Sequence, residues 1–226
     1  MARTGRPRGF DRDEAVQQAM ALFWEHGYEA TSLAQLKAAM GGISAASFYA
    51  AFGSKEALFR EAVDRYLATH GQVMAPLSDP ALPPREAVER TLRGSARMQT
   101  DSAHPFGCLV VLSTSTCSPE SRHLQALLAE ERHRNRAAML ACVERAAAEG
   151  GLPGDADAGA LAATFDTFLV GLTAQARDRV PLALLEAAIS GLMCVWDGLA
   201  KAGLQTQGVS VRPKQQRPPK AAARCA

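Results

Sequence analysis

The sequence has little net charge, since 25 Lys and Arg residues stand against 23 Asp and Glu, for a formal net charge of +2. Bulk charge therefore does not indicate a nucleic-acid partner, and the distribution of charge along the chain matters more. The composition, 47% hydrophobic and 21% charged, is ordinary for a globular protein, and 226 residues suffice for one or two domains.

Cysteine is scarce and scattered. The five cysteines form no C-x-x-C pair, which disfavours a disulfide framework or a zinc knuckle and favours a reducing cytosol. The N-terminus lacks the apolar stretch of a signal peptide. The sequence also has no uninterrupted run of about 18 apolar residues, which a membrane-spanning helix would need. We therefore expect a cytoplasmic protein with no membrane partner. The cysteines are Cys108, Cys117, Cys142, Cys194 and Cys225.

Basic residues gather at the two ends of the chain, without acidic neighbours. The N-terminal arm can serve solubility alone, or it can reach DNA phosphates or the minor groove, and the sequence leaves both interpretations open. The arm carries Arg3, Arg6 and Arg8, and the tail carries Arg212, Lys214, Arg217, Lys220 and Arg224.

Alternating strand patterns and hairpin turns are also missing, whereas apolar residues recur at helical spacing behind Ser and Asp caps. The sequence predicts an all-α fold of about nine helices. A proline-rich stretch over 76–86 suggests a domain boundary. The expected helices span about 11–27, 32–40, 44–52, 54–76, 84–100, 106–115, 119–149, 155–177 and 181–201. The expected parts are a flexible basic arm (1–9), a DNA-binding domain with its linking helix (10–76), a larger helical domain (77–204) and a disordered basic tail (205–226).

Two short helices and a tight turn fit within residues 33–54, which is the spacing of a helix-turn-helix. In such units the second helix enters the major groove, so its outer side needs small or polar residues that let the backbone approach. Phe48 and Phe52 would anchor this helix inward. The alternative is packing in any small helical bundle. The outward residues are Ser44, Ala45, Ala46, Ser47, Ala50 and Ala51.

The stretch "TSLAQLKAAMGGISAASFYAAFGSKEALFREAVDRY" (31–66) resembles the DNA-binding domain of the TetR family of bacterial transcriptional regulators. The matching elements are Thr31-Ser32, Gly42-Ile43-Ser44, Tyr49 to Phe52, and Ser54-Lys55-Glu56-Ala57-Leu58. The resemblance implies a homodimeric regulator, expected to be a repressor, released from a palindromic double-stranded operator by a small-molecule effector. It implies phosphate contacts from Thr31 and Tyr49, and backbone contact from Lys55.

Two features depart from the family pattern. Gly41-Gly42 stands where a single glycine is usual, which could re-aim the recognition helix. Ala45 and Ala50 stand where relatives often carry Lys or His, so fewer side chains can make bidentate base contacts. Ser44 and Ser47 are open between capping and base or phosphate contact. The candidate DNA-binding residues are Thr31, Ser32, Ser44, Ala45, Ser47, Tyr49, Lys55, Arg6 and Arg8.

The last two helices carry more apolar surface than one core-facing stripe needs, so we expect them to form a four-helix interface in a dimer. Its expected residues are Phe168, Leu172, Leu185, Ile189, Leu192 and Trp196. The resemblance also implies an apolar effector pocket in the C-terminal domain, although each candidate is open to plain core packing. The candidates are Met98, Phe106, Leu109, Leu112, Cys117, Leu128, Phe165 and Phe168.

Cys108 follows a glycine at the start of a predicted helix. A Gly-Cys-Leu sequence here resembles one branch of the family, some of whose members sense electrophiles or oxidants through cysteine. A helix N-terminus can lower a thiol pKa, but a free cysteine can equally be a small buried hydrophobe.

An enzymatic role is the remaining alternative. Glu120-x-x-His123 and Glu130-x-x-His133 each match an element of di-iron bundles. Ten residues on one helix separate them by about 15 Å and turn them to different faces, so they cannot share one metal pair. No nucleophile triad or nucleotide-binding loop stands out, and we expect no catalysis, no metal and no cofactor.

Overall fold

The computed structural model describes residues 11–115 and 117–208. This part of the chain folds into nine α-helices and two 3-10 helices, which confirms the all-α prediction. Arg6 and Arg8 lie outside the described residues, as does nearly all of the basic tail.

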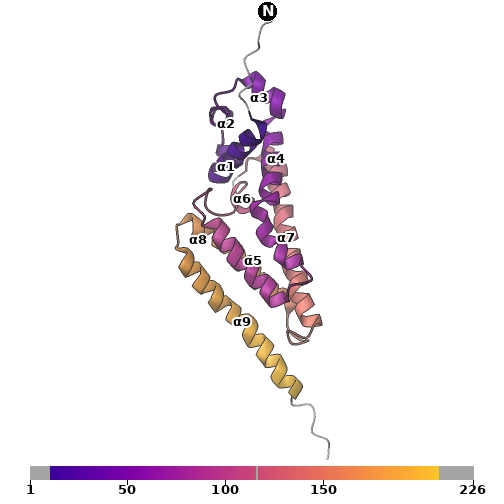
Figure 1. The fold of residues 1–226 in the computed structure, drawn as a ribbon. Coiled ribbons are helices and arrows are strands. Elements are labelled where there is room, and N and C mark those ends of the chain that lie inside the picture. The colour runs from indigo at the N-terminus through magenta and orange to yellow at the C-terminus, as the bar shows by residue number, and fades with distance from the viewer. Residues whose placement is uncertain (1–10, 116, 209–226) are drawn as a thin grey trace, which may run out of the picture.

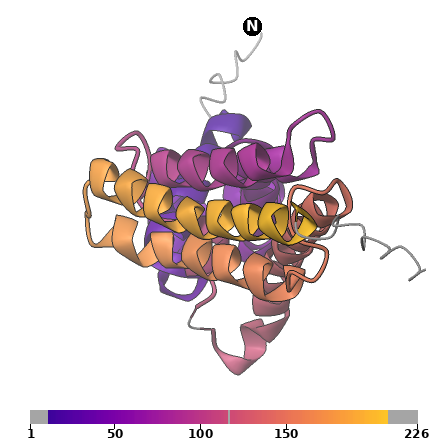
Figure 2. The ribbon, with the colours of Figure 1, turned by 90° about the horizontal axis from the view of Figure 1, so that it is seen from below.

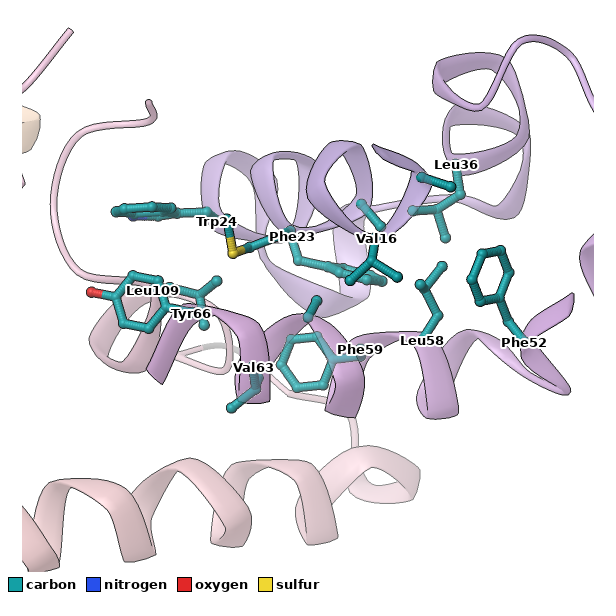
Figure 3. Close-up of a cluster of buried hydrophobic side chains, with 14 of the residues drawn as sticks. Val16, Phe23, Trp24, Leu36, Phe52, Leu58, Phe59, Val63, Tyr66 and Leu109 are labelled. Carbon is teal, nitrogen blue, oxygen red and sulfur yellow. The ribbon is translucent and has the colours of Figure 1, made fainter. Parts of the chain in front are cut away.

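The N-terminal helices are α1 (Arg12–Ala30), α2 (Leu33–Ala39), α3 (Ala45–Phe52) and α4 (Lys55–Ala68). Their starts follow from the caps in the sequence: the Asp11 carboxylate accepts from two backbone amides of the first turn, and Ser32 and Gln35 form a capping box. The four helices share a buried core to which each contributes at least one side chain (Figure 3). Its labelled members include Val16, Phe23, Trp24, Leu36, Phe52, Leu58 and Phe59.

Gly27 does not end the first helix as expected but kinks it. Its φ of 81° and ψ of 167° interrupt α1, which then continues to Ala30. The kink frees the amide of Tyr28, which donates to the carbonyl of Ser113 at 2.8 Å. A bend in the first helix therefore attaches it to the C-terminal domain.

The predicted continuous helix over 54–76 is wrong. α4 ends at Ala68, and Thr69 (φ −120°, ψ −86°) separates it from η1, a 3-10 helix over His70–Ser78. The Thr69 hydroxyl donates to the carbonyl of Arg65 at 2.8 Å, so the side chain caps the helix end. Pro76 has no amide to donate to an α-helix, and apolar periodicity alone did not register these local breaks.

The C-terminal helices are α5 (Pro84–Gln99), α6 (Leu109–Leu112), α7 (Arg122–Ala148), α8 (Ala158–Arg177) and α9 (Leu182–Gly208), with the 3-10 turn η2 (Pro119–Ser121) before α7. Two expectations fail here. The helix predicted over 106–115 is only four residues long. The long helix begins at Arg122 rather than Pro119, and Ser118 makes no side-chain cap. Its amide instead donates to Glu29 of α1, so a tertiary contact replaces the local one.

α4 and α7 run from the end formed by α1, α2 and α3 toward the opposite end of the molecule (Figure 1). Seen from below, α9 lies in front of α5 and α8, with the N-terminal helices behind them (Figure 2). A second buried core joins α5, α7, α8 and α9. α9 is thus an outer layer of the C-terminal domain.

One described helix segment, Leu182–Ala202, is long and apolar enough by composition to cross a membrane, with a mean hydropathy of 1.6. The sequence expectation missed it because Glu186 and Asp197 interrupt the apolar run. Both acids are tied to α5: Arg85 holds Asp197 at 2.6 Å and Arg97 holds Glu186 at 2.8 Å. Only 22% of the segment is buried, so its outer face is apolar and uncovered.

Candidate nucleic-acid interface and ligand pocket

The turn between α2 and α3 depends on two consecutive glycines. Gly41 and Gly42 have φ values of 77° and 75°, in the left-handed region that favours glycine, and a Cβ on either would meet no atom within 4 Å. The Gly42 amide donates to the carbonyl of Lys37 at 2.9 Å, which closes the end of α2. Backbone conformation, not space, requires glycine at both positions.

α3 presents a small, uncharged outer face. Phe48 and Phe52 are buried against the core, whereas Tyr49 is 51% exposed and rests edge-on against the Phe48 ring at 5.6 Å. Ser44 accepts from the Ser47 amide at 3.0 Å and its hydroxyl lies 3.0 Å from that of Ser47. Both serines remain exposed, so capping leaves their outer lone pairs accessible. The exposed small residues are Ser44, Ala45, Ala46, Ser47 and Ala50.

Thr31 is not exposed, as the expected phosphate contact would require. Its side chain is fully buried, and its hydroxyl donates to the carbonyl of Gly27 at 2.7 Å. A phosphate contact from this side chain is unavailable in this conformation, because the hydroxyl completes the kinked end of α1. Ser32, next to it, is exposed at the α2 N-terminus.

Lys55 opens α4, but its ammonium does not extend freely into solvent. It lies 4.3 Å from the centroid of the Tyr28 ring, a cation–π contact, and partial burial lowers its pKa. Ser54 caps the same helix by accepting from the Ala57 amide at 2.9 Å. The first turn of α4 thus combines the Lys55 ammonium with helix N–H groups, which favour an anion, and it also holds Glu56, whose carboxylate is paired with Arg60 and His123.

Residues 15–62 match the family described as "Bacterial regulatory proteins, tetR family". The HTH-type transcriptional repressor ComR of Escherichia coli (strain K12) is 32% identical over 201 residues, which cover 87% of this chain and 94% of that protein. This chain belongs to the TetR family of transcriptional regulators.

Solved structures agree. The TetR regulator CifR, with two cysteines replaced and bound to a 26-bp operator DNA, is 44% identical with a TM-score of 0.78, over 84% of this chain and 100% of that one. A TetR regulator from Rhodococcus sp. RHA1 is 36% identical with a TM-score of 0.55, over 80% and 96%. The helix-turn-helix of this TetR protein is therefore a DNA-binding element of a transcriptional repressor.

A pocket lies where α4 meets η1 and the helices of the C-terminal domain. Its cavity volume is about 60 Å³, and residues of α4, η1, α5, α6, α7 and α8 line it. Of the eight predicted pocket residues only Met98 does so; Leu109, Leu128 and Phe165 are in the cores instead. Sequence reasoning missed its polar members. One usable signal existed: Asp166 is a lone acid within the apolar run of α8. The polar and ionisable members are Tyr66, Ser95, Gln99, Cys108, Arg132, Asn135, Asp166 and Thr173.

The remaining predicted pocket residues lie elsewhere. Phe106 stacks under the guanidinium of Arg179 at 3.8 Å, and Phe168 lines a shallow hollow between α8 and α9. Leu112 and Cys117 line neither the pocket nor that hollow, and Leu112 packs against the N-terminal core. Periodicity identified these side chains as apolar but could not decide which of several inner surfaces each one faces.

Cys108 lines the pocket, and its surroundings do not lower the pKa of its thiol. Burial raises its pKa, outweighing the hydrogen bond from the Tyr66 hydroxyl at 3.4 Å, the amides of α6 and the charge of Arg132. Of the two interpretations left open by the sequence, this environment favours a small, largely desolvated side chain, because α6 is a single turn and desolvation dominates the pKa.

The segment that carries α6, part of which lines the pocket, is hydrogen-bonded to α1. The Trp24 indole donates to the carbonyl of Gly107 at 3.1 Å, and the Ser113 hydroxyl donates to the carbonyl of Phe23 at 3.3 Å. These contacts flank α6 on both sides. The α6 segment and the first helix of the DNA-binding domain are therefore in direct contact.

Four of the six predicted dimer residues are packed inside their own chain rather than exposed to a partner. Leu172, Leu185, Ile189 and Trp196 are buried in the core of their own chain. Phe168 and Leu192 are half-buried. The uncovered side of α9 carries Leu184, 61% exposed, and Val195, 46% exposed, with small residues between them. Both sides of α9 are apolar, and the one with the bulkier residues packs inward.

The two Glu-x-x-His elements bind other partners. His123 contacts Glu56 of α4 at 3.0 Å and the carbonyl of Glu120 at 3.1 Å. His133 is exposed. Within residues 11–115 and 117–208, no three His, Cys, Asp or Glu side chains are grouped as a metal site would require.

Proposed function

We propose that this TetR-family protein is a homodimeric repressor that binds a palindromic operator and leaves it when a small molecule occupies the pocket between α4, η1 and α8. The observation that carries the proposal is the exposed, uncharged outer face of α3 next to the cationic start of α4. This surface has the size and chemistry to enter a major groove. We place its action in the cytoplasm, with the DNA.

Operator reading would depend on few long side chains. α3 offers serine hydroxyls, alanine methyl groups and the Tyr49 phenol, which suit thymine methyl contacts, phosphate contacts and DNA shape more than bidentate readout. Tyr49 and Lys55 would hold phosphates, and Ser44 and Ser47 would share capping with DNA contact. Thr31 would act by positioning the α1–α2 junction.

Support for effector release comes from the position of the pocket. Gly71, Val73 and Met74 of η1 line it together with Tyr66 of α4. A ligand that fits the pocket in only one arrangement of these segments shifts the balance between DNA-competent and incompetent forms.

The test is a fluorescence-anisotropy titration of the protein with the intergenic DNA beside its own coding sequence. We expect Tyr49→Ala to weaken binding at least tenfold with an unchanged circular dichroism spectrum, because the residue is exposed and its ring supports no core contact beyond Phe48. Tyr49→Phe separates the hydroxyl from the ring. Unchanged affinity in Tyr49→Ala would reject the contact, and no binding by the wild type to any palindrome there would reject the operator proposal.

A further inference from the structure

Among the residues that the structure describes, Asp166 is the one acidic side chain that lines the pocket. It lies on α8 and is half-buried, and its carboxylate makes no hydrogen bond or ion pair with any described residue. Burial raises its pKa, and the positive charge of Arg136 offsets this only in part. A partly desolvated carboxylate without a partner is costly and gains free energy from any donor brought to it.

Most other polar groups of the wall already have partners, and among the described lining residues only the Asn135 side chain shares with Asp166 the lack of a hydrogen bond. Thr173 donates to the Gln99 side chain at 2.9 Å, and Gln99 donates to Ser95 at 2.8 Å. Arg132 donates to the carbonyl of Val110 at 2.7 Å, which uses one of its N–H groups. Among the described lining residues, Asp166 is therefore the one charged acceptor without a partner, while Arg132 and the Asn135 amide keep spare donors.

The charges of the wall select against charged ligands. Arg132 and Asp166 sum to zero, so the lining as a whole has no net charge to neutralise. A cation near Asp166 would meet the field of Arg132 and Arg136, and an anion near Arg132 would meet Asp166. A neutral group that both donates and accepts suits the pair better.

Size and surroundings narrow the class further. The apolar wall includes Leu67, Val110, Val111 and Leu169, and the cavity of about 60 Å³ is well below the 150 Å³ or so that holds benzene in an engineered cavity. A rigid ring does not fit this space, whereas a flexible short aliphatic chain can enter end-on with part of its length outside.

We infer that the pocket recognises a small uncharged aliphatic molecule bearing a hydroxyl group, with Asp166 as the group that accepts the hydroxyl hydrogen. This specificity rests on the proposed role of the pocket as an effector site. Asp166 would set ligand choice, while the contacts of η1 and α6 with the same ligand would carry the response.

The experiment uses the full-length protein labelled with ¹³C at methionine methyl groups. Met74 and Met98 line the pocket, whereas Met20 and Met139 are buried elsewhere and serve as internal references. 1-Butanol, butylamine and butyrate are titrated separately, at one pH and ionic strength. We expect 1-butanol to shift the Met74 and Met98 signals with an affinity at least fivefold above that for either charged compound.

Variants of Asp166 test whether its carboxylate causes the preference for 1-butanol. Asp166→Ala should lower 1-butanol affinity at least fivefold, and Asp166→Asn should lower it less, since the amide oxygen still accepts. Asp64→Asn, at an exposed acid of α4, is the matched control and should leave the affinity unchanged. Because Asp166 has no partner to lose, thermal unfolding should show both variants folded.

The proposed ligand class and the proposed operator release can fail independently of each other. Stronger binding of butylamine or butyrate, equal 1-butanol affinity in wild type and Asp166→Ala, or no shift of Met74 and Met98 with any of the three would overturn the inference. Operator release is measured separately by anisotropy. If 1-butanol binds through Asp166 while the operator stays bound, the ligand class stands and the proposed release fails.

Discussion

Two polar side chains, the buried Thr31 and the half-buried Cys108, lie where separate segments of the chain meet. The Thr31 hydroxyl closes the kinked end of α1, and the Cys108 thiol accepts from Tyr66 where α4 meets the pocket. Each group is polar, enclosed and paired inside the chain. Their contribution is to hold two backbone segments in register, and substitutions there should act on stability before they act on chemistry.

Thr31→Val should lower the free energy of unfolding by about 1–2 kcal/mol, because it leaves the carbonyl of Gly27 without its donor while keeping the volume. Urea denaturation measures the change. Ser32→Ala is the companion at the neighbouring position and removes the exposed capping box of α2, for about 1 kcal/mol. A Thr31→Val variant as stable as the wild type would show that the hydroxyl has no structural role.

Cys108 should react slowly with N-ethylmaleimide in the folded protein at neutral pH. Its raised pKa keeps the thiolate scarce, and burial limits access. In a variant with the other cysteines replaced by serine, the rate in the native state should be at least tenfold below the rate in guanidinium chloride. Equal rates, or loss of operator binding on brief exposure that Cys108→Ser abolishes, would restore the sensor interpretation.

Among the structural elements, the turns show what the sequence encodes locally. Capping serines, paired glycines and inward aromatics are short-range signals, and they placed α2, α3 and the start of α4 correctly. The break at Thr69 escaped because apolar periodicity does not register a local cap or Pro76, and the short α6 escaped because its flanks are held by contacts with distant α1. Pocket membership escaped for the same reason: periodicity assigns Phe165 and Asp166 to successive positions of one helix but not to core and cavity.

Gly41→Ala and Gly42→Ala should each destabilise the protein by about 1–3 kcal/mol, since alanine is strained at these positive φ values even where space is free. Gly94→Ala in α5 is the control. It adds the same methyl group in a helical conformation, at ordinary contact distance from Val73, and should be neutral or stabilising by up to about 1 kcal/mol. Chemical denaturation compares the three, and operator affinity of the folded variants reports on the aim of α3.

For the whole molecule, the uncovered side of α9 is the main unsatisfied surface. Leu184 and Val195 project from a helix whose opposite side is already packed on α5 and α8. An exposed apolar surface of this kind calls for a partner, and a second copy related by a twofold axis would also supply the second recognition helix for a palindrome.

Leu184→Glu should convert the dimer to a monomer in light scattering at micromolar concentration and weaken operator binding, because a carboxylate would be buried at the interface. The residue is 61% exposed in the single chain, so the fold should survive. Ala137→Glu, at an exposed position of α7, is the control and should remain dimeric. A monomeric wild type, or a dimeric Leu184→Glu, would contradict this interface.

The break at Thr69 joins two helical segments that differ in their rise and turn per residue. A 3-10 helix rises about 2.0 Å per residue against about 1.5 Å in an α-helix, and it turns about 120° per residue against about 100°. If the six residues from His70 to Ala75, ahead of Pro76, rewound as α-helix, α4 would be drawn in by about 3 Å and turned by about 120°. Distances between spin labels on the two recognition helices of a dimer would record such a step. Such a rewinding would be a screw motion of α4, in which a change of helical pitch takes the place of rotation about a hinge.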